Sequence, residues 1–275
     1  MIKVLAYDLD GTALNSAKEI TPRAANAIAR AIDRGILAIP CTGREIESVP
    51  ECVMETPGLR YLIANNGAQV YTMPERELIY SNTIEASVAL RVLSECRDFS
   101  AFIFAGDGVE KILDTKCAMW EDEEKRKLLP EFVSSIELSR TDLKEYITRT
   151  GNPLFKLIFL FYDEEEFGRI WDRLSGMDCV SVTSSGPENV EVMPRGTSKG
   201  EALKFVCSRI GAELSEVMAI GDNHNDIEMI VEAGYSVAMS NSIAKLRELA
   251  DSVTLSCDED GFAIAIERRI LNEDC

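Results

Sequence analysis

The sequence predicts an α/β protein with a Rossmann-like parallel-sheet core that is interrupted by an inserted α+β domain. Apolar strand-like segments alternate with amphipathic helical segments near both ends of the chain, which is typical of a parallel sheet covered by helices. The middle instead holds aromatic and β-rich runs between charged helical stretches. We therefore expect core over residues 1–83, the inserted domain over 84–188, and core again over 189–275.

The first core segment is expected to contain three strands, two helices and a hairpin. Thr21 and Pro22 suit the N-cap and first position of a helix that Gly35 ends, and another helix is expected from about Glu45. The expected strands are 2–7, 36–41 and 61–64, followed by a turn at 65–67 and a hairpin that pairs 70–71 with 78–80 across Pro74.

The last core segment resumes the alternation of strands and helices. Strands are expected over 190–193, 217–220, 236–239 and 253–255, and helices over 198–210, 226–233 and from 242 onward. Two charged runs in the inserted domain, 121–127 and 163–166, are interpreted as a solvated helix face and the acidic start of a helix.

Composition excludes several kinds of partner. The net charge of −18, from 47 acidic and 29 basic residues, disfavours binding to nucleic acid or to an anionic membrane. No apolar run approaches the roughly 20 residues of a membrane span, and no signal peptide is evident. The eight cysteines include no C-x-x-C pair, so reduced thiols in a cytoplasmic protein are expected. The sequence does not indicate the oligomeric state.

The first chemical motif is Asp8-Leu9-Asp10-Gly11-Thr12, directly after a buried strand. Strand alternation predicts that Asp8 and Asp10 point the same way. Crowded like charges are costly, and Mg²⁺, which prefers oxygen ligands, would offset that cost. The alternative is an ordinary Asp-Gly turn with solvated carboxylates.

Two further motifs suit an anionic ligand. Thr42 and Gly43, after the second strand, offer a hydroxyl and an approachable backbone N–H, although a simple Thr-capped turn would look the same. Ser198 and Glu201 fit a capping box. Lys199 then lies in the first helical turn, where a cation is disfavoured, so either it helps to bind an anion or it is a tolerated exposed lysine.

The fourth motif follows another apolar strand. Asp222 would add a third carboxylate to a magnesium site, whereas Asp226 alternatively only orients its neighbours at a helix start. His224, the one histidine, is interpreted as a loop residue rather than a catalyst. All four motifs fall at the carboxyl ends of predicted parallel strands or at helix starts, which is where open α/β sheets bind ligands.

These motifs, in order along the chain, resemble the four motifs of the haloacid dehalogenase superfamily. They are Asp8-Leu9-Asp10-Gly11-Thr12, Thr42-Gly43-Arg44, Lys199 and Gly221-Asp222-x-x-Asn225-Asp226. The position and size of the inserted domain resemble the large cap of the Cof-type phosphatases in this superfamily.

The resemblance implies a Mg²⁺-dependent phosphatase of small phosphorylated metabolites. It implies that Asp8 is the nucleophile, that Asp10 is the general acid and base, and that the cap closes over the site to exclude bulk water. The implied metal ligands are Asp8, the Asp10 carbonyl and Asp222, and the implied phosphate-binding residues are Leu9, Thr42, Gly43, Lys199 and Asn225, supported by Arg44 and Asp226.

Two alternatives stay open from the sequence. A sugar phosphomutase of the same superfamily would keep the chemistry and transfer the phosphoryl group instead of hydrolysing it. A sensor of phosphorylated ligands would bind without turnover, although such a protein needs neither the nucleophile Asp8 nor the acid Asp10. The physiological substrate would depend on cap residues that the sequence does not identify.

Overall fold

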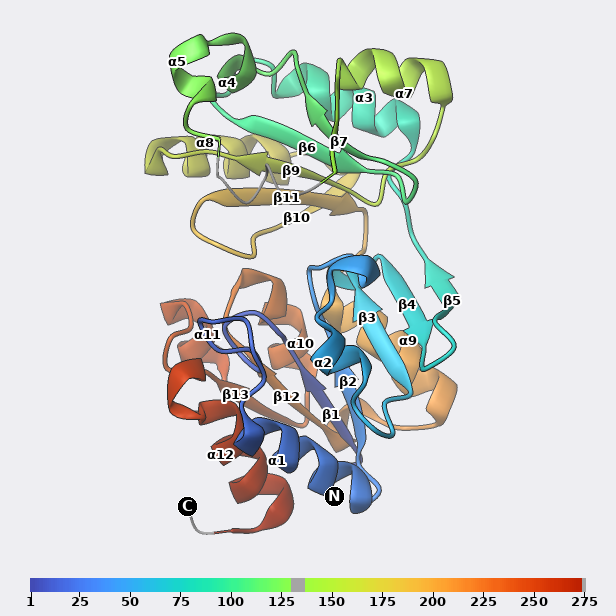
Figure 1. The fold of residues 1–275 in the computed structure, drawn as a ribbon, viewed down its shortest axis with the longest axis vertical. Coiled ribbons are helices and arrows are strands. Elements are labelled where there is room, and N and C mark those ends of the chain that lie inside the picture. Colours follow the sequence, from blue (N-terminus) through green and yellow to red (C-terminus); the bar gives the residue numbers. More distant parts are fainter. Residues whose placement is uncertain (130–136, 274–275) are drawn as a thin grey trace. The chain divides into compact units, whose positions relative to one another are not determined.

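The computed structural model describes residues 1–129 and 137–273, and the chain divides into two compact units (Figure 1). One unit comprises 1–81 and 198–275, and the other comprises 82–197. The second boundary therefore falls after residue 197 rather than after 188. The difference arises from strand β11 (Asn189–Pro194), which we expected in the core but which pairs with β9 and β10 of the second unit.

Five parallel strands form the core sheet, in the order β14-β13-β12-β1-β2. Alternate side chains of β1 enter two different apolar clusters, with Leu5 and Tyr7 on one face and Val4 and Ala6 on the other. Both faces are thus buried, as in helix-covered parallel sheets, and the predicted α/β class is confirmed. The strands are β1 (Val4–Tyr7), β2 (Leu37–Pro40), β12 (Val217–Gly221), β13 (Tyr235–Ala238) and β14 (Ser252–Val253).

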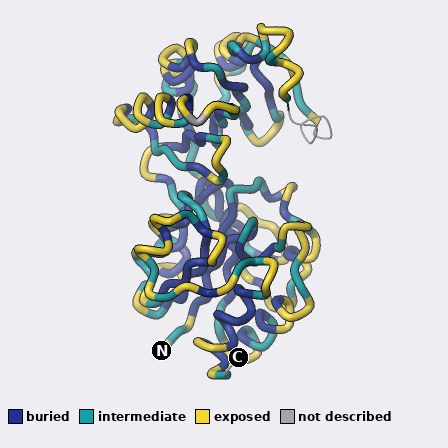
Figure 2. Tube along the Cα trace, turned by 90° about the vertical axis from the view of Figure 1, so that its left-hand side faces the viewer, coloured by how far each residue is buried: buried dark blue, intermediate teal, exposed yellow. Residues whose placement is uncertain are grey.

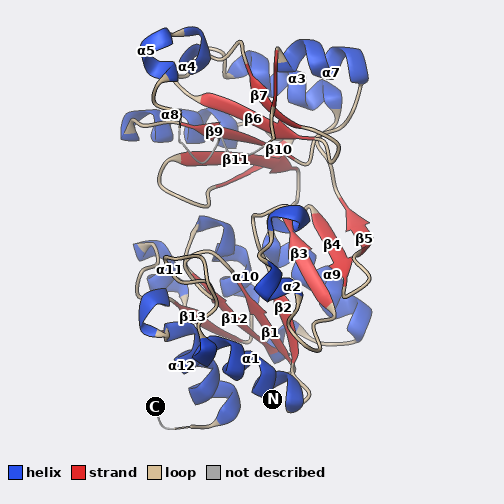
Figure 3. Ribbon diagram, viewed as in Figure 1, coloured by secondary structure: helices blue, strands red, loops and turns tan. Residues whose placement is uncertain are grey.

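Helices cover both faces of this sheet (Figure 3). The Thr21 side chain caps α1 by accepting a hydrogen bond from the Ala24 backbone at 3.1 Å, and Pro22 opens the helix, both as predicted. Helices α1 (Pro22–Asp33) and α12 (Gly261–Ile266) pack on one face, and α9 (Lys199–Ile210), α10 (Ile227–Glu232) and α11 (Ala244–Leu249) on the other.

The segment after β2 differs from the prediction in two ways. Strand β3 (Tyr61–Ala64) joins β4 (Gln69–Thr72) and β5 (Glu77–Ser81) in a separate antiparallel sheet, and one bridge, Cys41 to Ile63, links it to the end of β2. The helix expected from Glu45 is only a turn followed by α2 (Glu51–Met54). Pro50 lies between them and cannot continue a helix that has already begun.

The second unit is a six-stranded sheet, in the order β10-β11-β9-β6-β7-β8, packed against helices through one apolar cluster. Figure 2 colours each residue by how far it is buried. All its strand pairs are antiparallel except β7 with β8. The strands are β6 (Phe102–Gly106), β7 (Lys111–Asp114), β8 (Ser139–Thr141), β9 (Lys156–Leu160), β10 (Val180–Thr183) and β11.

One helix of this unit begins where the charge pattern indicates. Asp163 caps α8 through the Glu165 backbone, so the acidic run at 163–166 does start a helix. The helices are α3 (Ala86–Glu95), α4 (Ala118–Glu121), α5 (Glu123–Arg126), α7 (Leu143–Thr150) and α8 (Glu164–Ser175). Within the described residues, no helix is long and apolar enough to cross a membrane.

Candidate active site

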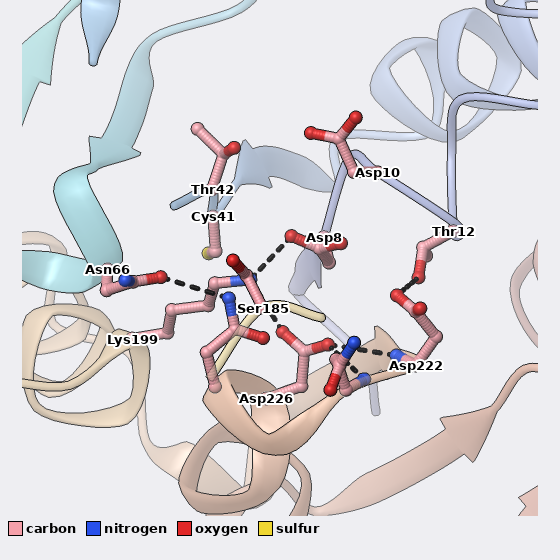
Figure 4. A network of polar contacts seen from close by, with 12 residues as sticks. Asp8, Asp10, Thr12, Cys41, Thr42, Asn66, Ser185, Lys199, Asp222 and Asp226 are labelled. Carbon is pink, nitrogen blue, oxygen red and sulfur yellow. Dashed lines mark hydrogen bonds and ion pairs between the residues drawn. The ribbon is translucent and has the colours of Figure 1, made fainter. Parts of the chain in front are cut away.

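Three parallel strands bring the predicted site residues to one edge of the core sheet. Asp8 follows β1, Thr42 follows β2 and Asp222 follows β12. These strands are neighbours, with β1 between the other two. Side chains far apart in the sequence therefore meet at the carboxyl end of the sheet (Figure 4).

Lys199 is fully buried at the start of α9. Ser198 caps this helix by accepting from the Glu201 backbone at 3.1 Å, as the capping-box pattern predicted. The Lys199 ammonium donates to Asp8 Oδ1 at 2.5 Å and to Asp226 Oδ1 at 2.7 Å. The alternative of an exposed, tolerated lysine is therefore wrong.

The charges around this lysine keep it protonated. Burial alone would lower the pKa of the Lys199 ammonium, but the carboxylates of Asp226 and Asp8 outweigh burial and hold that pKa above its ordinary value. The site thus contains a permanent, desolvated positive charge next to the predicted nucleophile. Such a charge interacts strongly with an anion because little water screens it.

Asp8 and Asp222 are buried carboxylates that lie close together. Burial is the main cause that raises the pKa of Asp8 to about 7 and that of Asp222 to about 9, with the charge of Asp226 adding to both. The Thr12 hydroxyl donates to Asp222 Oδ1 at 2.9 Å and fixes its orientation. Gly11 permits this approach, because its φ is 80° and a Cβ there would lie 2.5 Å from Asp222 Oδ2.

Both carboxylate oxygens of Asp226 already accept hydrogen bonds. Oδ1 accepts from Lys199, and Oδ2 accepts from the backbone N–H groups of Asp222 at 2.9 Å and Asn223 at 3.0 Å. Its side chain is fully buried. These contacts are those of a residue that orients its neighbours, which was one of the two alternatives that the sequence left open.

The Asp10 carboxylate points away from Asp8 (Figure 4). Strand pairing ends at Tyr7, so strand alternation does not extend to these residues, and the expectation that both carboxylates point the same way is wrong. Arg44 donates to both Asp10 oxygens, at 2.6 and 2.7 Å, and Lys18 donates at 2.9 Å. Burial alone would raise the pKa of Asp10, but these two cations lower it to about 2.

Thr42, Asn225 and Leu9 are further predicted residues. The Thr42 Oγ1 accepts from the Arg44 backbone at 3.1 Å, which leaves the hydroxyl proton available to a ligand. The Asn225 side-chain amide donates to Asn66 Oδ1 at 3.0 Å. The Leu9 side chain is fully buried in the core, so only its backbone could contact a ligand.

Sequence reasoning missed two residues of this site. Asn66 was interpreted only as part of a turn, and Lys18 was not singled out. The Asn-Asn-Gly pattern indicates a turn, but it does not reveal that the turn is buried beside Asn225. Lys18 follows a run with no distinctive pattern, and only its contact with Asp10 identifies it.

The donor set suits a hard divalent cation. Asp8, Asp222 and Asp226 bring carboxylate oxygens within 4.8 Å of one another. Both oxygens of Asp226 already accept hydrogen bonds, whereas Asp8 and Asp222 each have one carboxylate oxygen, Oδ2, without a hydrogen-bond donor among the described residues, so these two side chains are the better placed to coordinate an ion. Burial and mutual repulsion raise their pKa values, and a cation between them would offset both effects.

Comparison with known proteins agrees with this geometry. Residues 5–266 match the family of haloacid dehalogenase-like hydrolases. Two proteins of Bacillus subtilis are similar over nearly their whole length: 5-amino-6-(5-phospho-D-ribitylamino)uracil phosphatase YcsE, 29% identical over 98% of this chain and 96% of the relative, and phosphatase YwpJ, 30% identical over 95% and 98%. A solved haloacid dehalogenase-like hydrolase from B. subtilis is 27% identical, with a TM-score of 0.84 over 98% of this chain and 100% of that chain.

The family match and the similar phosphatases therefore identify the chain as a phosphoric monoester hydrolase. The chain belongs to the haloacid dehalogenase-like hydrolases, in the Cof-type group that carries an inserted cap, as the four sequence motifs predicted.

Proposed function

We propose that the protein is a Mg²⁺-dependent phosphatase that hydrolyses small phosphorylated metabolites through an aspartyl-phosphate on Asp8. The observation that carries this proposal is the fully buried Lys199, which donates to both Asp8 and Asp226. A buried cation with two carboxylate partners holds the Asp8 side chain in one orientation. It also provides positive charge where a phosphoryl group would bind.

In the first step, an Asp8 oxygen attacks phosphorus while the bond from phosphorus to the leaving oxygen breaks. Among the described residues only Lys199 donates a hydrogen bond to the Asp8 side chain, through Oδ1, so Oδ2 is the oxygen free to attack. A proton from the Asp10 carboxyl neutralises the leaving oxygen.

In the second step, water attacks the phosphorus of the aspartyl-phosphate, and Asp10 accepts the proton of that water. Inorganic phosphate leaves and Asp8 is regenerated. Because Arg44 and Lys18 lower the pKa of Asp10 to about 2, the observed arrangement suits this second step. For the first step Asp10 must hold a proton, which requires its contacts with Arg44 and Lys18 to loosen.

The phosphoryl oxygens would bind to donors from four segments. Thr42 offers its hydroxyl proton, and Lys199 has one ammonium hydrogen beyond the two given to carboxylates. The backbone N–H groups of Leu9 and Gly43 and the Asn225 amide are the other proposed donors. Donors fixed in advance of binding lower the barrier because they need not reorganise during the reaction.

Asp8, Asp222 and the backbone carbonyl of Asp10 would hold the Mg²⁺ ion. When bound, the ion neutralises the charge of the phosphoryl group and of its carboxylate ligands. Thr12 would keep Asp222 oriented for this role through its 2.9 Å hydrogen bond.

A panel of phosphate esters tests the proposed function. It includes sugar phosphates, pyridoxal phosphate, flavin mononucleotide and p-nitrophenyl phosphate, with Mg²⁺ present and Asp8→Asn as the control. We add 5-amino-6-(5-phospho-D-ribitylamino)uracil because the similar B. subtilis protein YcsE is named for it. Release of phosphate above the control supports the proposal, and no release from any ester opposes it.

The same panel separates the two alternatives. Accumulation of an isomerised sugar phosphate without free phosphate would identify a phosphomutase. Tight binding without any product would identify a sensor. We also propose that the protein works in the reducing cytoplasm, which is supported by free thiols at seven cysteines of the described chain.

A further inference from the structure

A buried loop of three residues, Asn65–Gly67, connects β3 to β4 in an unusual conformation. All three residues have left-handed backbone angles, with φ values of 48°, 53° and 94°. Such angles are uncommon outside glycine, although asparagine adopts them more readily than most residues, and they often occur at functional sites. Asn65 and Asn66 are each only 1% exposed, so contacts within the protein enforce these angles here.

The Asn65–Gly67 loop contacts two segments that carry candidate site residues. The Asn66 backbone N–H donates to the Thr42 carbonyl oxygen at 2.9 Å. Gly67 lies against the beginning of α9, because a Cβ at this position would be 2.1 Å from the Ser198 carbonyl oxygen. The loop thus supports both the Thr42 segment and the start of the helix that carries the buried ammonium group.

The Asn66 side chain reaches a third segment (Figure 4). Its Oδ1 accepts from Asn225 Nδ2 at 3.0 Å. The same oxygen is 2.8 Å from the position that a Cβ of Gly43 would occupy. The Asn66 carboxamide therefore lies between Gly43 and Asn225, two residues to which we assign binding of the phosphoryl group.

This contact determines how the Asn225 amide is turned. Its Nδ2 faces Asn66, so its Oδ1 faces away. Asn225 is 7% exposed, and its Oδ1 has no hydrogen-bond partner within the described chain. Buried polar atoms almost always have a partner, so an oxygen held in this way indicates that a bound ligand or water completes the site.

We propose that Asn66 is a positioning residue for phosphoryl transfer, an inference that rests on the proposed phosphatase function. It does not contact the substrate itself. It acts through Asn225, whose amide it orients, and through Gly43, whose backbone it packs against. The left-handed backbone of the loop is what places the Asn66 carboxamide between these two residues.

The variant Asn66→Gly separates this role from a purely structural one. Glycine adopts the φ of 53° without strain, which offsets part of the cost of the lost hydrogen bond from Asn225, so the protein is expected to stay folded. Only the carboxamide is lost. We expect kcat on p-nitrophenyl phosphate to fall about 10- to 100-fold, which is the scale of loss when a group is misplaced by about 1 Å.

Asn65→Gly is the matched control in the same loop. This residue has a similar backbone angle and burial, but its side-chain amide donates to Gln69 Oε1 at 2.7 Å instead of contacting Asn225. We expect its kcat to stay within threefold of the wild-type value. An equal loss in Asn65→Gly and Asn66→Gly would overturn the proposal, because it would indicate a general effect of the loop.

A double-mutant cycle with Asn225→Ala tests whether Asn66 acts through Asn225. If it does, the double variant loses less activity than the product of the two single losses predicts. Losses that multiply, or wild-type kcat in Asn66→Gly, would overturn the proposal.

Calorimetry with inorganic phosphate provides a readout without turnover, and we expect weaker binding by Asn66→Gly. A wild-type protein that binds phosphate normally but releases none would contradict the proposed function alone, while one that does neither would overturn both proposals.

Discussion

The Lys199 ammonium and the Asp226 carboxylate form an ion pair of 2.7 Å in which both side chains are fully buried. Such a pair does not stabilise a fold more than apolar residues of the same size would, because both charges lose their hydration. Removal of one partner is nevertheless costly, since the other is left buried and uncompensated. The pair is therefore better explained by the chemistry at Asp8 than by stability.

The first prediction concerns Lys199→Ala. It leaves Asp8 and Asp226 without their shared cation, so the free energy of unfolding in metal-free buffer should fall by about 3–5 kcal/mol, measured by chemical denaturation. Lys204→Ala on the same helix is the control. Its partly exposed ion pairs with Glu201 and Glu232 predict a loss below about 1 kcal/mol. Equal losses in the two variants would argue against a special role of the buried lysine.

The second prediction distinguishes the two catalytic aspartates. Asp8→Asn removes the nucleophile and should abolish turnover of every substrate. Asp10→Asn removes the proton donor, so its effect should depend on the leaving group. In the rate of the first step, measured in single-turnover reactions, a sugar phosphate should lose about 10²- to 10⁴-fold, whereas p-nitrophenyl phosphate, whose leaving group is a stable anion, should lose much less. The same factor on both substrates would mean that Asp10 is not the acid.

Much of the site could be predicted because short local patterns determine it. Asp8, Thr42 and Asp222 each follow an apolar strand, and parallel strands bring their carboxyl ends to one edge. Lys199 could be singled out because it interrupts an otherwise favourable capping pattern. In each case the residues that form the pattern lie within about ten positions of one another in the sequence.

The parts that could not be predicted depend on contacts between distant segments. The run at β11 is apolar enough to be a strand in either unit, and only its pairing with β9 and β10 assigns it to the second. The partners of Asp10 could not be foreseen either, because Lys18 and Arg44 approach it from two different segments. Turn composition likewise did not reveal that Asn66 is buried.

The third prediction concerns the metal. Burial and repulsion raise the pKa values of Asp8 and Asp222, so a cation between them should stabilise the folded protein. Mg²⁺ at 100 times its Kd adds about 2.7 kcal/mol to the free energy of unfolding. Thermal unfolding in Mg²⁺ should therefore occur at a higher temperature than in EDTA. Asp222→Asn should lose most of this shift, and a full shift in that variant would contradict the assigned ligands.

The fourth prediction concerns Asp107 in the second unit. Burial alone would raise the pKa of its carboxyl, but four donors outweigh burial and lower it. These are the backbone N–H groups of Val109 and Glu110, the Tyr146 hydroxyl and the Asn152 amide, all between 2.7 and 2.9 Å. A depressed pKa stabilises the folded state above the ordinary aspartate value of about 3.9. That stabilisation is lost as the pH falls through the lower pKa of the folded protein.

Asp107→Asn should therefore lower the unfolding temperature at pH 6 and differ much less from the wild type near pH 3, because the wild-type carboxylate is then becoming protonated. Circular dichroism melts at the two pH values measure this difference. Asp172→Asn, which removes an exposed carboxylate on α8, is the control and should change neither melt appreciably. If Asp107→Asn shows the same loss at both pH values, its effect comes from the geometry of the turn and not from the ionised carboxylate.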